Sequence, residues 1–441
     1  MSDSLSRPVE ASERLRHVDM IRGVALFGIL LMNITGFGLP MAYGDPTVYG
    51  GATGANLWAF ITTSMLFEGT QRALFSMLFG ASVILLVARL EAAGRPDSAD
   101  IYFRRLTWMV IFGIVHSYFL LWTGEVLFFY GATGMFLYVF RHAQAKTMMT
   151  IALAGIVLGA GLNVLDSYNA NGKYRKASVA QQRQAAGATL TDDEKADIEA
   201  WKSFEGDLKP DKKKIDADLA AHRGSYKDVF LFQAPHNAHG EAWVLYRFFF
   251  DMFSMMLIGM AFFRAGVLTL ERPSATYWSM VVLGYTVGLA TNYFELRILL
   301  DGQFSALSII RSNWTYDIGR LAMATGHLGL LLLFCRSGLV LWLQRSLAAV
   351  GQMALSNYVS QSIVCALIFD GFGFGMYGYL QRYQLYYVVV SIWIVQLIIS
   401  PIWLRHFRFG PVEWLWRSLT YRTRQPMRHD QPARMPAPML A

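Results

Sequence analysis

Runs of about 20 apolar residues recur along most of this chain, separated by short polar connections. A helix needs about this length to cross the hydrocarbon core of a bilayer. A soluble helix of the same length would place polar residues on its solvent face and so interrupt the run. The pattern predicts an all-α fold class, a polytopic transmembrane helix bundle.

The composition agrees with lipid as the solvent for most of the chain. Of its 441 residues, 16% are charged and 54% are hydrophobic, whereas an average soluble domain is about 25% charged. We predict about ten spans and one polar insertion. The spans are expected near residues 18–39, 57–90 (a broken or interfacial piece and then a crossing), 106–122, 126–140, 147–166, 243–263, 276–296, 314–335, 347–370 and 385–404.

The distribution of arginine predicts the orientation of these spans. Connections expected on one side carry repeated basic residues, whereas connections 41–56 and 123–125 on the other side carry no Lys or Arg. The basic side of a membrane protein faces the cytoplasm. With an even number of spans and a basic tail, both termini are expected in the cytoplasm. Nucleic acid is not an expected partner, because the basic excess sets topology and meets lipid headgroups.

Residues 167–241 differ from the rest in being rich in Lys, Asp, Ala and Gln. This segment is expected outside the cytoplasm, where Thr191 and Glu194 form a capping box that begins a soluble helix. It is either a solvated cap, in part disordered, or a lid that handles substrate. The predicted organisation is a transmembrane bundle 1–166, the polar segment 167–241, a second bundle 242–404 and a basic cytoplasmic tail 405–441.

Ionisable side chains within the predicted spans are candidates for a site, because lipid makes them costly unless they are paired or hydrated. Asp19 and Arg22 are three residues apart in the first span, so they share a helix face and can pair. Either the pair is an anchor, or Arg22 binds a phosphate-bearing ligand from the cytoplasm. Asn33 lies three helical turns beyond Arg22 and belongs to the same stripe.

His116 and Glu125 form a second candidate pair. His116 lies in the outer half of span 106–122, and the turn at Gly124 returns Glu125 to a similar level on the next helix. A neighbouring carboxylate fixes the tautomer of an imidazole and raises its basicity, which suits a general base or a proton relay. The alternative is an interior histidine whose contacts are purely structural.

Several polar residues in the remaining spans either join helices or line a polar path. Spacings of three or four residues favour three ion pairs: Glu68 with Arg72, Arg247 with Asp251, and Asp317 with Arg320. No two histidines in the spans have the spacing of zinc ligands, so no metal is expected. The candidates for a polar path are Asp317, Arg320, His327, Asn357 and Gln361.

Five segments carry a resemblance to a known family: RHVDMIRGVALFGILLMNI at 16–34, FEGTQRALFSMLFGAS at 67–82, GIVHSYFLLWTGEVLFFYGATG at 113–134, VGQMALSNYVSQSIV at 350–364 and GPVEWLWRSLTY at 410–421. They resemble the bacterial YeiB family, whose carboxy-terminal half is catalogued as domain of unknown function 418. The resemblance covers nearly all of the hydrophobic chain but not residues 167–241, and it implies a multipass protein of the bacterial inner membrane.

The opening motif of that family is similar to that of the transmembrane acyltransferases, including the heparan-alpha-glucosaminide acetyltransferases and the acyltransferase-3 proteins. Asp19, Arg22 and Asn33 fall on the motif positions. This chain has Gly124-Glu125 where the family usually has Gly-Asp. No histidine follows Asn33 in the outer loop, where the glucosaminide enzymes place theirs, so His116 becomes the best substitute base.

The resemblance implies an acyltransferase that moves an acyl group from a cytoplasmic thioester, acyl-CoA, to a hydroxyl or amine of an envelope glycan or lipid. His116, oriented by Glu125, is then expected to deprotonate the acceptor, and Asn33 to stabilise the oxyanion. Donor binding is expected at four residues of the inner side: Asp19, Arg22, Arg104 and Arg105.

The rival hypothesis is a transporter or permease, in which the same charges form a path for substrate and protons. His116, Glu125, Asp317 and His327 are then expected to act as relay groups. Expected partners are membrane lipids and the envelope acceptor. The sequence also leaves a homodimer open.

Overall fold

The computed structural model describes residues 15–429, except for the side chains of His239 and of residues 241–248. Helices make up the fold of this part of the chain, which contains no named β-strand. The all-α prediction is confirmed. In chain order the helices are α1 (Arg16–Gly38), α2 (Gly54–Leu66), α3 (Thr70–Ala92), α4 (Ser98–Phe119), α5 (Leu127–Met135), η2 (Phe136–Phe140), α6 (Ala145–Ala185), α7 (Asp192–Leu208), α8 (Lys212–His222), α9 (Tyr226–Arg264), α10 (Ser274–Asp301), α11 (Ala306–Ser312), α12 (Tyr316–Ser337), α13 (Leu341–Gln352), α14 (Ala354–Phe369), α15 (Arg382–His406) and α16 (Pro411–Tyr421).

Among the described residues, five helical segments are long and apolar enough to cross a membrane. The pair α13 and α14, bent by 82° at the break between them, makes a sixth if it counts as one span. The chain is therefore a polytopic membrane protein, and the number of ten spans stays a prediction. The five segments are Arg16–Gly38, Gly54–Ala92, Ala145–Ala185, Tyr316–Ser337 and Arg382–His406.

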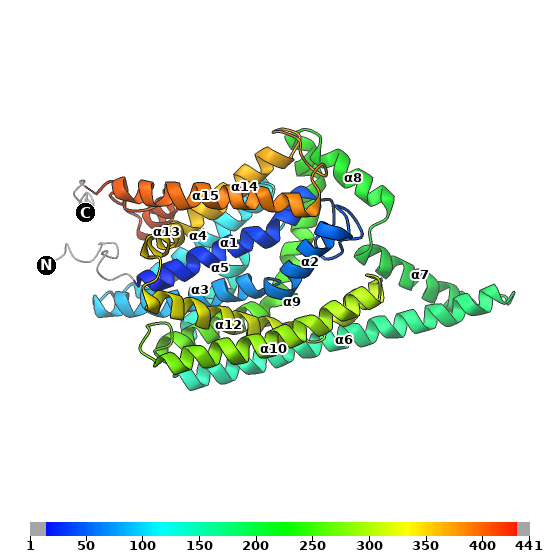
Figure 1. The fold of residues 1–441 in the computed structure, drawn as a ribbon, viewed down its shortest axis with the longest axis horizontal. Helices are drawn as coiled ribbons and strands as arrows, with labels where there is room; N and C mark the ends of the chain where they lie inside the picture. The colour runs from blue at the N-terminus through cyan, green and yellow to red at the C-terminus, as the bar shows by residue number, and fades with distance from the viewer. Residues whose placement is uncertain (1–14, 430–441) are drawn as a thin grey trace, which may run out of the picture.

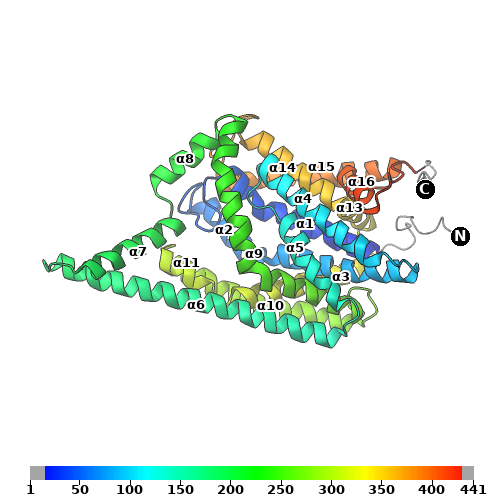
Figure 2. The same cartoon turned by 180° about the vertical axis from the view of Figure 1, so that it is seen from behind.

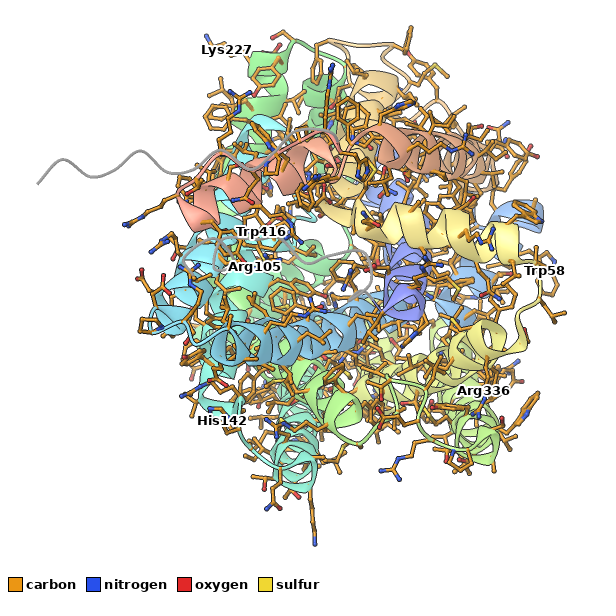
Figure 3. The ribbon with its side chains drawn as sticks, turned by 90° about the vertical axis from the view of Figure 1, so that its left-hand side faces the viewer. Trp58, Arg105, His142, Lys227, Arg336 and Trp416 are labelled. Atoms are coloured by element: carbon orange, nitrogen blue, oxygen red, sulfur yellow. The ribbon has the colours of Figure 1, made fainter. Side chains whose placement is uncertain are left out.

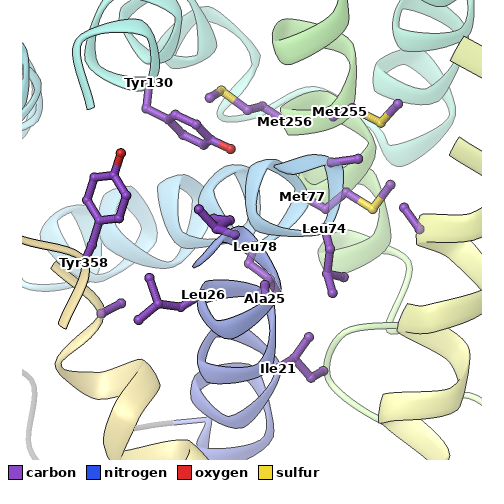
Figure 4. Packing of buried hydrophobic residues seen from close by; sticks show 14 of the residues in the cluster. Ile21, Ala25, Leu26, Leu74, Met77, Leu78, Tyr130, Met255, Met256 and Tyr358 are labelled. Carbon is purple, nitrogen blue, oxygen red and sulfur yellow. The ribbon is translucent and has the colours of Figure 1, made fainter. Parts of the chain in front are cut away.

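Helix α1 lies in the interior of the bundle and packs on α3, α13, α14 and α15. Helices α6 and α10 run along one long side of the molecule, and α15 runs along the opposite side (Figures 1 and 2). The core between them is apolar, and Leu26 of α1, Leu78 of α3 and Met256 of α9 meet in it (Figure 4).

The described chain begins and ends at one end of the bundle, and the helices of the polar segment lie at the other (Figures 1 and 2). Helix α1 begins, and α15 ends, at one end, which we call the termini end (Figure 1). Helices α7 and α8 lie at the opposite end, which we call the cap end (Figures 1 and 2). There His222 of α8 contacts Asp370, which follows α14, with 2.8 Å between Nδ1 and Oδ1. The polar segment is thus tied to the bundle rather than detached from it.

Glycines allow two helix pairs to approach closely. A Cβ atom added to Gly80 of α3 would lie 1.9 Å from the Met256 carbonyl oxygen of α9, and one added to Gly259 would lie 1.8 Å from the Met77 oxygen. Helices α1 and α13 meet in the same way, since a Cβ on Gly351 would lie 1.8 Å from the Asp19 oxygen. Small residues at such crossings are typical of helix packing in membranes.

Candidate functional site

A cavity of about 780 Å³ lies at the termini end, between α1, α3, α4, α5, α14 and α16. Its lining carries five arginines and two carboxylates, so positive charge is in excess there. Figure 3 views the molecule from this end and shows Arg105 and Trp416 facing each other. The charged lining residues are Asp19, Arg22, Arg89, Arg95, Arg105, Glu413 and Arg417.

The polar part of the cavity holds three of the residues predicted for donor binding. Arg22 pairs with Asp19, with 2.6 Å between Nη1 and Oδ1, which confirms the predicted contact. Arg22 also donates to the Ser82 hydroxyl at 3.0 Å. Arg105 lies over the Trp416 ring, 3.7 Å from its centroid, and in the described part of the chain no carboxylate forms an ion pair with it. An arginine without a counterion beside a second arginine suits an anionic ligand.

Arg104, the fourth predicted donor residue, does not line this cavity. It pairs with Asp100 and donates to the Thr420 carbonyl oxygen at 2.9 Å, which ties α4 to α16. Asn33 is half-buried in α1, and it too lies outside the cavity lining. The structure therefore brings Asp19, Arg22 and Arg105 together but does not bring Arg104 or Asn33 to them.

Deeper in, the cavity becomes apolar. Leu26, Met109 and Leu127 line it together with the two tyrosines Tyr130 and Tyr358, whose rings are seen in Figure 4. The Tyr130 hydroxyl is held by the Ser76 hydroxyl at 2.7 Å. Such a lining suits a hydrocarbon or thioester arm rather than a second charged group.

His116 and Glu125 lie next to this apolar part, and both are buried. The distance from His116 Nδ1 to Glu125 Oε1 is 3.5 Å, which confirms that the pair approach each other. The Glu125 carboxylate is fixed by the backbone N–H groups of Leu127 and Phe128, the latter at 2.8 Å. Neither residue lines the cavity. Tyr358 does line the cavity, and its ring packs edge-on against the His116 imidazole, with 4.9 Å between the ring centroids. Tyr358 therefore lies between the cavity and the His116–Glu125 pair.

A separate buried network contains Asp317 and Arg320. The predicted pair is confirmed at 2.8 Å, and Arg320 also pairs with Asp251 of α9. Arg72 approaches the same Asp251 at 3.8 Å. The predicted pairing of Asp251 with Arg247 falls on a side chain outside the described residues. The network therefore joins α3, α9 and α12 across a long sequence distance.

The remaining candidates are placed as helix contacts. His327 is 2.9 Å from the Met323 carbonyl oxygen of its own helix. Asn357 donates to the Ser400 hydroxyl at 3.1 Å, and Gln361 donates to Gln396 at 2.9 Å, so both join α14 to α15. In the described part of the chain, no three His, Cys, Asp or Glu residues are grouped to hold a metal ion.

Four residues in or next to the cavity were not predicted as site residues from the sequence. Tyr358 and Ser362 belong to the quoted segment 350–364, and Trp416 and Arg417 to the quoted segment 410–421, so those motifs pointed to the correct stretches of chain. The spacing within each stretch gave no sign that α14 and α16 meet α4.

Comparison with known proteins agrees with this description. Residues 262–423 match the family described as "Protein of unknown function (DUF418)". The chain is 29% identical to the uncharacterized protein YeiB of Escherichia coli K12, over 94% of this chain and 98% of that protein. It is also 29% identical to the uncharacterized protein YxaH of Bacillus subtilis 168, over 96% of this chain and 98% of that one. No solved structure matches.

The apolar helices and the buried ion pairs define a polytopic all-α membrane protein. Within that class, the chain is similar over almost its full length to YeiB and YxaH, and residues 262–423 match the family of unknown function.

Proposed function

We propose that this protein is an acyltransferase of the bacterial inner membrane. It takes an acyl group from a cytoplasmic thioester of the acyl-CoA type and delivers it to a hydroxyl or amine of an envelope glycan or lipid. The observation that carries the proposal is the cavity at the termini end, which joins an arginine-rich mouth to an apolar interior ending at Tyr358 beside His116.

Donor binding is assigned to the charged part of the cavity. Guanidinium groups bind phosphate oxygens through paired N–H donors, and Arg22 and Arg105 offer such groups from α1 and α4. Asp19 holds Arg22 in place. The apolar interior then receives the thioester arm. Arg104 is assigned to the support of α16, because it is bound to Thr420 outside the cavity.

The chemistry is assigned to His116 as general base and to Glu125 as the group that orients it. Glu125 approaches Nδ1, and proton transfer is assigned to Nε2, which lies 2.8 Å from the Ser362 hydroxyl. The role of Asn33 as an oxyanion donor stays a prediction. The termini end is assigned to the cytoplasm, because the basic connections lie there and the donor is cytoplasmic.

Binding of a non-hydrolysable acyl-CoA analogue to the protein in lipid nanodiscs tests the donor site. Arg105→Gln is the sharpest variant, because Arg105 has no ion-pair partner among the described residues and its loss leaves no unpaired carboxylate. We expect its Kd to rise about tenfold or more. Arg297→Gln is the matched control, because Arg297 is exposed and does not line the cavity. Its Nη2 atom lies 2.9 Å from Asp301 Oδ1. An unchanged Kd in Arg105→Gln would remove the cavity as the donor site.

A transporter or permease is the second candidate, and the buried network around Arg320 favours it. Charges that are buried in a membrane bundle often mark ion or proton paths. Here they are mutually paired, which serves helix packing equally well. Proton-coupled uptake into proteoliposomes that is lost in Arg320→Gln would favour the transporter.

A further inference from the structure

Three side chains contact one another in succession beside the cavity, and one of them is far from the other two in the sequence. Ser362 Oγ of α14 is 2.8 Å from His116 Nε2 of α4, and His116 Nδ1 is 3.5 Å from Glu125 Oε1. All three side chains are buried, with relative exposures of 1%, 1% and 5% for Ser362, His116 and Glu125. The hydroxyl and the imidazole are 246 residues apart in the sequence.

This order of groups is that of an activated nucleophile, its base and the carboxylate that orients the base. Placing the imidazole proton on Nδ1, beside the Glu125 carboxylate, leaves Nε2 to accept the proton of Ser362. Glu125 is itself fixed by two backbone N–H groups at the start of α5. The carboxylate can therefore hold the ring in one orientation.

Along α14, Ser362 lies between a residue that lines the cavity and a residue that contacts the cap helix. Tyr358, four residues earlier, lines the cavity, and Asp370, eight residues later, contacts the cap helix α8. At the helical rise these separations are about 6 Å and 12 Å. Ser362 thus lies between the proposed donor side and the proposed acceptor side of the membrane.

We propose that Ser362 is a catalytic nucleophile that carries the acyl group between two half-reactions, an inference that rests on the proposed acyltransferase function. In the first step Ser362 Oγ attacks the thioester carbonyl while His116 takes the hydroxyl proton. The carbon–sulfur bond breaks, and the thiol leaves with that proton. In the second step the acceptor hydroxyl or amine attacks the serine ester, His116 takes its proton, and Ser362 leaves with a proton restored from His116.

Two neighbouring groups fit this scheme. Tyr358 packs against His116 from the cavity side, so the donor arm has to displace that ring to reach Ser362. On the cap side, Asn237 of α9 donates to the carbonyl oxygen of Ser117, the neighbour of His116, at 2.9 Å. The Asn237 Oδ1 atom is buried and accepts no hydrogen bond in the described part of the chain, so it is available to an acceptor hydroxyl.

The test is to trap the acyl-enzyme. Protein in nanodiscs is mixed with radiolabelled acetyl-CoA or palmitoyl-CoA without acceptor and quenched in acid, and its peptides are analysed by mass. We expect label on the peptide that contains Ser362, no label in Ser362→Ala, and a hydroxylamine-sensitive label in Ser362→Cys. Ser360→Ala is the matched control, because Ser360 lies on the same helix and donates to the Asn357 carbonyl oxygen.

The outcomes separate the two claims. Thioester cleavage that persists in a folded Ser362→Ala variant without any label would overturn the serine intermediate and leave the acyltransferase intact. Absence of thioester cleavage in the wild-type protein would overturn both. Donor binding and the melting temperature are measured for each variant, and Ser362→Cys reports on the site if Ser362→Ala does not fold.

Discussion

The Glu413 carboxylate joins two elements that line the cavity, because it extends from α16 to the start of α14. It accepts hydrogen bonds from the backbone N–H groups of Leu355 at 2.7 Å and Ser356 at 3.1 Å. Burial raises the pKa of the Glu413 carboxyl, and the hydrogen bonds from Ser356 oppose that effect. The carboxylate thereby accepts from two of the N–H donors that have no partner within their own helix at its N-terminus.

Glu413→Ala should therefore lower the stability of the protein, because those N–H groups lose their acceptor in a buried site. We expect a cost of about 2 kcal/mol. Thermal unfolding in detergent measures it, and Glu413→Gln, which keeps one acceptor oxygen, should lose less. Glu199→Ala on the exposed face of α7 is the control. Equal melting temperatures for Glu413→Ala and that control would contradict the capping role.

At the scale of residues, contacts between residues close in sequence could be predicted, whereas contacts between distant residues could not. The spacing of Asp19 and Arg22 within one helix predicts their contact, and a short turn predicts that of His116 and Glu125. The contacts of Ser362 with His116 and of Arg320 with Asp251 depend on how separate helices pack, which no local spacing encodes.

At the scale of elements, the crossing of α3 and α9 depends on reciprocal glycines. Gly259 leaves its helix in contact with the Met77 backbone, and α3 carries Ser82 into the cavity. Gly259→Ala should separate the two helices and cost about 1–3 kcal/mol. Melting temperatures measure the effect, with Gly161→Ala on α6 as control, because nothing lies within 4 Å of an added Cβ there. An equal effect of the two substitutions would show that the close approach is unimportant.

The apolar runs predicted where helices form, but not where the helices end. Helix α6 continues to Ala185 and α9 begins at Tyr226, so both extend well into the polar segment 167–241. The helical turns of α6 and α9 that lie in the polar segment carry polar residues, so they lack the run of apolar residues from which the span limits were predicted. The 82° bend between α13 and α14 was also missed, because the sequence 347–370 reads as one apolar run.

At the scale of the whole molecule, the structure separates the termini end from the cap end, and the proposal assigns them to opposite sides of the membrane. A reporter fused after residue 441 should be cytoplasmic, and one inserted near residue 205 in α7 should be external, because the basic connections favour the cytoplasm. Protease access and thiol labelling in intact cells measure both positions. External labelling of the carboxy-terminal reporter would reverse the assignment of donor and acceptor sides.

The central claim is acyl transfer with His116 as the base, and thioester consumption by the purified protein in nanodiscs tests it most directly. The wild-type protein should cleave acyl-CoA, and a folded His116→Ala variant that still binds the donor should cleave it about 10²- to 10⁴-fold more slowly. Full activity in a folded His116→Ala variant would contradict the assignment of the base. Absence of cleavage by the wild-type protein, together with proton-coupled uptake into proteoliposomes, would contradict the acyltransferase itself.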